Sequence, residues 1–427
     1  LQTLNDYLNT NGGGTIEFPA GQFFFKGTFV KSPNVSIVGL GDFEPWNGNG
    51  GFGSARGTYF LHAPNIAGTD FITLDQTDLL VNYHGNVNIK NIYIQGSINS
   101  GIGLKLEKIV NGNIENLLII DFGTNLQING SMKTTFSRVS SMRARDFELK
   151  MSLPISTTTT FYRCYFGQST GDMNSIPISI DDKVALGIDF ISCAVESTEK
   201  GIYLGAGNVI NFDNIYTENV PSTSGPEGIV SIGLTDPAQN DKGTYTFIGG
   251  AIAGTNGIQD AGSKAFNVDY CGSLTVVGVK ITRVNKTIAS TLNSRGITFI
   301  GGYDMQVTNG VSLCNALGNI NIIGGSSGSY QAEYPSQLKD FKIVSKSGKS
   351  YKVINEPNYT GTDLFFVSED GTKVLGLDES KNIKHHFSGN KGLAKNVDIY
   401  GAVPSPTFTG ISDSSSIWAE VVDGVNR

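Results

Sequence analysis

The most constraining feature of the sequence is a short apolar unit that recurs six times between residues 89 and 218. Successive copies begin 25, 22, 25, 29 and 22 residues apart. The copies are Ile89–Gln95, Ile114–Ile120, Phe136–Met142, Phe161–Gly167, Phe190–Glu196 and Phe212–Glu218, with looser copies at Phe247, Leu274 and Phe299. Each copy is rich in β-branched and aromatic residues and is bordered by Asn, Gly and Ser, as strands are. A unit this short cannot bury its apolar face alone. The repeat therefore predicts an all-β solenoid, a parallel β-helix.

The register of the unit predicts which side chains face the core. The fourth position is apolar in every copy and forms an inward ladder that includes Cys164 and Cys193. Because side chains alternate along a strand, the fifth and seventh positions must point outward. The first and fourth positions of the unit are both apolar, although strict alternation would place them on opposite faces of the strand. We therefore expect a turn or bulge between them.

Composition narrows the class of protein. The net charge is −7, which argues against a nucleic-acid partner because that requires a basic surface. No apolar run approaches the length of a membrane span, so we expect no membrane insertion. The four cysteines lack metal-ligand spacing and are expected to be buried free thiols. The chain begins at Leu1 without Met, and we expect a further segment before it.

The organisation along the chain predicts two parts. Residues 1–11 carry leucines at helical spacing and are expected to form a helix that caps the solenoid. The parallel β-helix is expected to span residues 1–330, and glycan binding and catalysis are assigned to it. Charged hairpin-like strands then predict a small C-terminal antiparallel β domain with a polar tail in residues 331–427, as a trimerisation region.

The beginning of the chain also shows a family resemblance. The stretch Gly-Gly-Gly-Thr-Ile-Glu-Phe-Pro-Ala-Gly-Gln-Phe-Phe-Phe at residues 12–25, followed by Val-Ser-Ile-Val-Gly-Leu-Gly at 35–41, resembles the opening of the pectate-lyase-like β-helix superfamily. Bacteriophage tailspike depolymerases are the members it resembles most. The resemblance implies a right-handed parallel β-helix, a homotrimer located on a virion tail, and cleavage of a bacterial surface polysaccharide such as a capsule or O-antigen.

Glycoside hydrolysis requires two carboxyl groups, and the register supplies a candidate pair. Glu196 and Glu218 occupy the seventh position of adjacent copies, so their backbones should lie about 4.8 Å apart. Asp213, on the same coil as Glu218, is a further catalytic candidate. The candidate substrate-binding residues are Tyr165, Tyr216, Arg163 and Glu199, and no metal or cofactor is expected. An endo-acting glycosidase is therefore the favoured function.

Two other functions remain open from the sequence. A polysaccharide lyase needs a base and a cation beside a uronate, and Arg163 with Tyr165 provides that combination. A spike that binds glycan without cleaving it is the third alternative, since fold alone does not determine activity.

Overall fold

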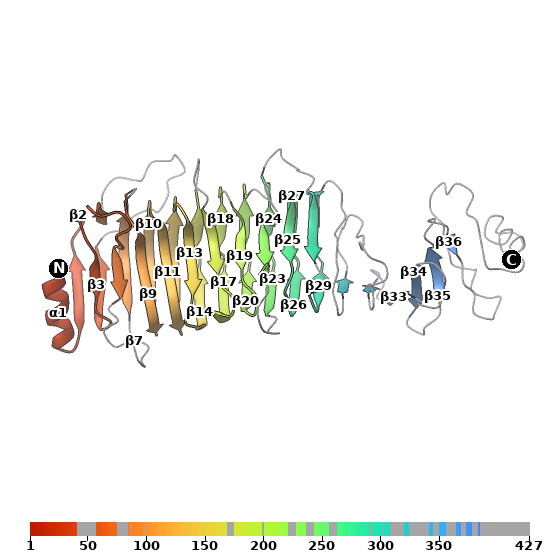
Figure 1. Ribbon diagram of the computed structural model, residues 1–427, viewed down its shortest axis with the longest axis horizontal. Helices are drawn as coiled ribbons and strands as arrows, with labels where there is room; N and C mark the ends of the chain where they lie inside the picture. The colour runs from red at the N-terminus through yellow and green to blue at the C-terminus, as the bar shows by residue number, and fades with distance from the viewer. Residues whose placement is uncertain are drawn as a thin grey trace, which may run out of the picture.

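The computed structural model shows a solenoid of short parallel strands (Figure 1). It describes residues 1–40, 57–74, 84–85, 87–97, 99–168, 175–198, 200–220, 228–235, 243–255, 263–290 and 293–301, and the later strands given below. The coils stack along the long axis of the molecule, with α1 at the N-terminal end (Figure 1). The predicted parallel β-helix is confirmed. The Gly-rich loop around residues 41–56, the insertion at 221–227 and the tail after residue 384 lie outside the described residues.

Each coil contributes to three parallel sheets, here called A, B and C. Sheet A contains β1 (Gly14–Phe18), β4 (Val35–Gly39), the first parts of β8 (Asn88–Gln95), β10 (Asn113–Ile120) and β12 (Thr135–Met142), then β14 (Ser156–Tyr162), β17 (Ala185–Ile191), β20 (Val209–Asp213), β23 (Thr244–Ile248), β26 (Ser273–Val277), β29 (Ile297–Ile300) and β31 (Ile320–Ile323). Sheet B contains β2 (Gly21–Phe25), β5 (Thr58–His62), the second parts of β8, β10 and β12, then β15 (Tyr165–Gly167), β18 (Ala194–Glu196), β21 (Tyr216–Glu218), β24 (Ala251–Ala253), β27 (Lys280–Val284) and β30 (Tyr303–Val307).

Sheet C completes each coil. It contains β3 (Phe29–Lys31), β6 (Ile72–Leu74), β9 (Ile102–Val110), β11 (Thr124–Met132), β13 (Phe147–Ser152), β16 (Ile176–Ile180), β19 (Ile202–Leu204), β22 (Val230–Ile232), β25 (Lys264–Val268) and β28 (Lys286–Ser290), and β7 (His84–Gly85) pairs with the end of β9. Three sheets thus enclose one long apolar core.

Stacked phenylalanines fill much of that core. Phe136, Phe161, Phe190, Phe212 and Phe247 occupy the same register position in successive coils, with neighbouring ring centroids 4.6 to 4.8 Å apart. The predicted inward ladder at the fourth position is also confirmed. Its members are Ile92, Leu117, Val139, Cys164, Cys193 and Ile215, each at most 2% exposed. Cys164, Cys193 and Cys271 are buried free thiols, as expected.

The turn expected between the first and fourth positions is a left-handed bend at the third. Asn91, Asn116, Arg138, Arg163, Ser192 and Asn214 all have φ between 52° and 59° there. This conformation is uncommon outside glycine but suits Asn, whose short side chain tolerates it. The bend turns the chain from sheet A into sheet B, and for this reason the apolar positions on its two sides need not alternate strictly.

The two ends of the solenoid differ. The predicted N-terminal helix is present as α1 (Gln2–Thr10), and its Leu8 packs on the core while buried Asn5 donates a hydrogen bond to Ser32 Oγ at 2.9 Å. Near the other end, β32 (Phe341–Val344) pairs parallel with β31. The following strands pair antiparallel, as the hairpin-like pattern predicts: β33 (Ser350–Asn355), β34 (Leu364–Ser368), β35 (Lys373–Leu377) and β36 (Ile383–Lys384). The division at residue 330 and the trimerisation role of the C-terminal part stay predictions.

Candidate functional site

The candidate carboxylates lie side by side on the outer face of sheet B. Glu196 ends β18, Glu218 ends β21, and the two residues are direct partners in the parallel ladder. Both are partly exposed, while Val195 and Thr217, which precede them, are buried. The predicted outward register of the seventh position is therefore confirmed for this pair. Adjacent strands in a sheet lie about 4.8 Å apart, which places the two side chains at neighbouring points of one surface.

Each carboxylate has a tyrosine partner, but the two environments differ. Tyr165 OH donates to Glu196 Oε2 at 3.3 Å from the preceding coil, and Tyr216 OH donates to Glu218 Oε2 at 2.6 Å from the same strand. Glu218 also forms an ion pair with Arg283, whose Nη1 lies 3.4 Å from Glu218 Oε1. Among the described residues, Glu218 thus accepts two hydrogen bonds, one of them from a charged donor, whereas Glu196 accepts one, from Tyr165.

These environments shift the pKa values of the two carboxyl groups in opposite directions. Partial burial raises the pKa of Glu196; the Tyr165 hydrogen bond opposes this, and the negative charge of Glu218 adds to the rise. The hydrogen bond from Tyr216 lowers the pKa of Glu218, with a further contribution from Arg283. The same Tyr216–Glu218 contact raises the pKa of the Tyr216 phenol to about 12. At a pH between the two carboxyl pKa values, Glu196 holds a proton and Glu218 is ionised.

Gly167 allows the coils to approach closely at this point. It occupies the seventh position of the coil before Glu196 and is the direct register partner of Glu196, and its φ is 155°. A Cβ on Gly167 would lie 2.0 Å from the carbonyl oxygen of Glu196, so any other residue would displace the strand that carries this carboxylate.

Among the described residues, no hydrogen bond or ion pair joins Asp213 or Arg163 to the pair. Asp213 is the exposed last residue of β20 in sheet A. The left-handed bend at Asn214 separates it from Glu218, which lies in sheet B. The guanidinium of Arg163 lies over the ring of Tyr162, 5.1 Å from its centroid, while Tyr165 bonds to Glu196. Arg163 thus contacts Tyr162 and Tyr165 contacts Glu196, and the lyase alternative built on Arg163 and Tyr165 stays a prediction. Glu199 lies outside the described residues.

Two basic residues near Glu218 were missed by the sequence reasoning because one repeat was placed in the wrong register. The copy predicted to begin at Leu274 actually begins at Val276, which pairs with Phe247 and Phe299 in the core row. In this corrected register, Lys280 occupies the outward fifth position and Arg283 the bend after the seventh. The signal that identifies the correct register is Gly278, which has φ 64° at the third position, where the earlier copies carry their bend.

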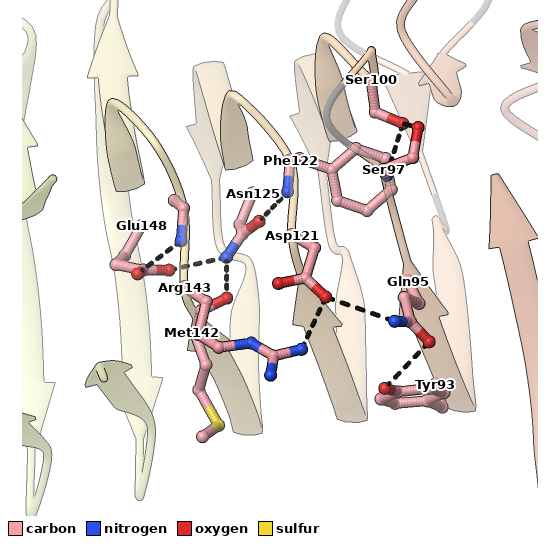
Figure 2. A network of polar contacts seen from close by, with 11 residues as sticks. Tyr93, Gln95, Ser97, Ser100, Asp121, Phe122, Asn125, Met142, Arg143 and Glu148 are labelled. Atoms are coloured by element: carbon pink, nitrogen blue, oxygen red, sulfur yellow. Dashed lines mark hydrogen bonds and ion pairs between the residues drawn. The ribbon is translucent and has the colours of Figure 1, made fainter. Parts of the chain in front are cut away.

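A second polar network lies on the preceding coils (Figure 2). On the outer face, Arg143 pairs with Asp121, and Gln95 Nε2 donates to the same carboxylate at 3.3 Å. Tyr93 OH donates to Gln95 Oε1 at 3.4 Å. These residues extend the polar surface from Glu196 towards the N-terminal coils.

Glu148 belongs to the buried part of this network. It is fully buried, and it accepts a hydrogen bond from Asn125 Nδ2 at 2.6 Å (Figure 2). It also accepts hydrogen bonds from Ser141 Oγ at 2.7 Å and from the Ala144 N–H at 2.9 Å. A carboxylate with this many internal donors, closed off from solvent, fixes the corner of the coil and does not meet a substrate.

An apolar cluster borders the polar surface. Tyr59, Tyr93, Leu118, Ile120 and Met142 occupy outward positions of sheet B yet are at most 9% exposed, and Tyr165 packs against them. Tyr165 is therefore held in place on one side by apolar contacts while its hydroxyl reaches Glu196.

Comparisons with known proteins identify the fold. No family model and no curated protein matches the sequence. Among solved structures, the surface adhesin PfbA of Streptococcus pneumoniae is similar at a TM-score of 0.54 and 12% identity, covering 87% of this chain and 93% of the adhesin. At this identity the similarity establishes the β-helix fold.

Two further solved structures are similar at lower scores. The catalytic domain of a GH87 α-1,3-glucanase in complex with tetrasaccharides has a TM-score of 0.49 and 14% identity, covering 81% of this chain and 66% of that one. The tailspike gp42 of an Acinetobacter phage has a TM-score of 0.46 and 10% identity, covering 93% of this chain and 80% of the tailspike. Among the described residues, no helix is long and apolar enough to cross a membrane.

Proposed function

We propose that this chain is a polysaccharide-cleaving spike of the phage tailspike type, acting as an endo-glycosidase on a bacterial capsule or O-antigen. The single observation that carries the proposal is the pair of Glu196 and Glu218, which are adjacent in register. The pKa of Glu196 is raised above its ordinary value and that of Glu218 is lowered. Two carboxyl groups whose surroundings separate their pKa values are the arrangement that glycoside hydrolysis uses.

The two carboxyl groups have different roles in this proposal. Glu196, protonated, gives its proton to the glycosidic oxygen as the bond from that oxygen to the anomeric carbon breaks. Glu218, ionised, attacks the anomeric carbon and forms a glycosyl ester. Water then hydrolyses this ester while Glu196, now ionised, accepts the water's proton. The strand spacing of about 4.8 Å fits the separation of about 5 Å between carboxyl groups in retaining enzymes, so we expect retention at the anomeric carbon.

Tyrosines on both sides favour a sugar ring at this point. Tyr216 is 41% exposed beside Glu218, and Tyr165 lies beside Glu196. The fifth position between them is Ala194, which leaves the space above it free of a long side chain. Aromatic faces pack against the apolar face of a pyranose, while the hydroxyls hold the carboxylates in place.

The experiment is incubation with a panel of capsular and O-antigen polysaccharides, followed by mass analysis of the products. Wild-type protein should release oligosaccharides of defined repeat length, and Glu196→Gln and Glu218→Gln should each reduce the rate by about a hundredfold or more. Asp213→Asn is the matched control, and it should keep wild-type activity because Asp213 lies in sheet A. Undiminished cleavage by both Gln variants would refute the assignment of the site.

The same experiment separates the alternative functions. Products that absorb in the ultraviolet through a new C=C bond would indicate the lyase. Bound but intact polymer would indicate a glycan-binding spike, the alternative favoured by the similarity in fold to the adhesin PfbA.

We propose further that the chain is a homotrimer on the virion tail. Exposed apolar side chains on sheet A support association between copies: Tyr162, Ile248 and Ile300 are 37%, 47% and 37% exposed at the same register position. Sedimentation equilibrium should give three times the chain mass, and Ile248→Lys should weaken the assembly. A monomer at micromolar concentration would refute the proposal.

A further inference from the structure

The two tyrosines beside the carboxylates are held in different ways. Tyr216 is 41% exposed and bonds to Glu218 on its own strand. Tyr165 is partly buried, and its hydroxyl crosses to the next coil to reach Glu196 Oε2 at 3.3 Å. A side chain that contacts a carboxylate across coils fixes that carboxylate only if its own ring is fixed. The surroundings of the Tyr165 ring therefore decide whether this contact orients Glu196.

The Tyr165 ring packs against the apolar cluster on the outer face of sheet B. Met142 is the member of this cluster on the coil next to Tyr165, since β12 and β15 are neighbours in the ladder. It is 1% exposed, although the seventh position points outward. Tyr59 and Tyr93 continue the cluster, and their ring centroids lie 4.8 Å apart in an edge-to-face arrangement. Close packing of this kind restricts the rotamers of an aromatic side chain, so the Tyr165 hydroxyl lies at a fixed place.

The hydroxyl of Tyr165 stays a hydrogen-bond donor across neutral pH. Burial and the charge of Glu196 raise the pKa of this phenol above its ordinary value; Glu148 adds to the rise and Gln168 opposes it. Glu196 Oε2 therefore accepts this hydrogen bond whether the carboxyl group is ionised or protonated. A protonated carboxyl group carries its hydrogen on one oxygen and accepts best through the other. The contact with Tyr165 thus assigns the proton of Glu196 to Oε1.

We propose that Tyr165 is a positioning residue for Glu196, and that the apolar cluster holds it in that role through Met142. Tyr165 holds Oε2, so that the proton on Oε1 is the one given to the glycosidic oxygen, while the exposed Tyr216 offers its ring to the sugar. This inference rests on the proposed function, because it takes Glu196 as the acid. A residue in this role changes the rate of bond cleavage more than the binding of substrate.

The first measurement follows the titration of Glu196 and needs no substrate. Infrared difference spectra of the full chain against Glu196→Gln isolate the carboxyl band of this residue as the pH is varied. Tyr165→Phe removes the hydroxyl and keeps the ring. The lost hydrogen bond favours the ionised form, and Tyr216 and Glu218 beside Glu196 are unchanged, so the pKa of Glu196 should rise. Tyr162→Phe, on the same coil in sheet A, is the matched control and should titrate as wild type. An unmoved titration in Tyr165→Phe would overturn the positioning role.

The second measurement is cleavage of the polysaccharide that the panel identifies as substrate. Tyr165→Phe should lower kcat by about ten- to a hundredfold and leave KM close to that of wild type. The high-pH limb of its kcat/KM profile should move to higher pH, because the acid keeps its proton longer. A raised KM with unchanged kcat would overturn the proposal, because the hydroxyl would then bind the sugar and not the carboxyl group.

Two methionine variants separate the role of the cluster from general stability. Met142→Ala should lower kcat and move the titration of Glu196 in the same direction as Tyr165→Phe, because it loosens the ring that Met142 supports. Met151→Ala, at a fully buried methionine of sheet C, is the matched control and should lower stability without moving the titration. A titration unmoved by Met142→Ala would overturn the role of the cluster. Undiminished cleavage by Glu196→Gln would overturn the hydrolase, whereas the infrared titration tests the Tyr165 contact by itself, so the two failures are distinguishable.

Discussion

A buried lysine near the N-terminal end gives a stability prediction with a definite pH dependence. Lys31 ends β3 with its side chain fully buried, and its Nζ donates to the carbonyl oxygens of Ser32 at 2.9 Å and Pro33 at 3.5 Å. Burial lowers the pKa of Lys31 from 10.5 to about 7. Lys31→Met keeps the length of the side chain and removes the charge, so it isolates the cost of burying the ammonium group.

The magnitude follows from the difference between the folded and unfolded pKa values. Below pH 7 the lysine is charged in both states, and the difference between its pKa of 10.5 in the unfolded chain and about 7 in the folded chain corresponds to about 5 kcal/mol of destabilisation. Between pH 7 and 10.5 the unfolded chain binds the proton and the folded chain does not, so stability rises with pH. At pH 9.5 about 1.4 kcal/mol of the penalty remains. Losing the donor to two carbonyls costs the variant about 1 to 3 kcal/mol at every pH.

Lys31→Met should therefore be more stable than wild type by about 2 to 4 kcal/mol at pH 6 and equal or less stable at pH 9.5. Thermal unfolding of both proteins at the two pH values, followed by circular dichroism, measures the double difference. Lys26→Met, at an exposed position, is the control and should show no such pH dependence. A stability difference that stays constant between pH 6 and 9.5 would refute the reasoning, because it would mean that the lysine titrates alike in both states.

Three further predictions concern the site and the core. Arg283→Gln should raise the pKa of Glu218 because it removes a charged donor, so the low-pH limb of the kcat/KM profile should move to higher pH; an unmoved limb would exclude Glu218 as the ionised group. Phe190→Ala should cost about 3 to 5 kcal/mol in the free energy of unfolding, measured by denaturant titration, because it interrupts the phenylalanine stack; a loss below 1 kcal/mol would mean that the core closes over the cavity. Glu148→Gln should cost about 1 to 3 kcal/mol by placing an amide donor among existing donors, yet leave the cleavage rate of folded protein unchanged; a lost rate with unchanged stability would give Glu148 a role in the chemistry.

Much of the solenoid could be predicted from the sequence because its information is local and repeated. The spacing of Phe161, Phe190 and Phe212 fixes the coil, and each copy independently reports the same inward and outward positions. The prediction was wrong for one copy that has no aromatic residue at its start: Leu274 was taken in place of Val276. A shift of two residues keeps the same face, so alternation alone could not reveal the error.

The repeat in the sequence is enough to predict that Glu196 and Glu218 are neighbours on an outer face, since parallel stacking brings equal positions of adjacent coils together. The difference between the two carboxylates comes from contacts that form only when the chain is folded. Tyr165 reaches Glu196 across coils, and Arg283 approaches Glu218 from a strand 65 residues later in the chain. Acidity depends on burial and on charges within a few ångströms, and such distances between separate coils are set by side-chain packing, which the repeat does not encode.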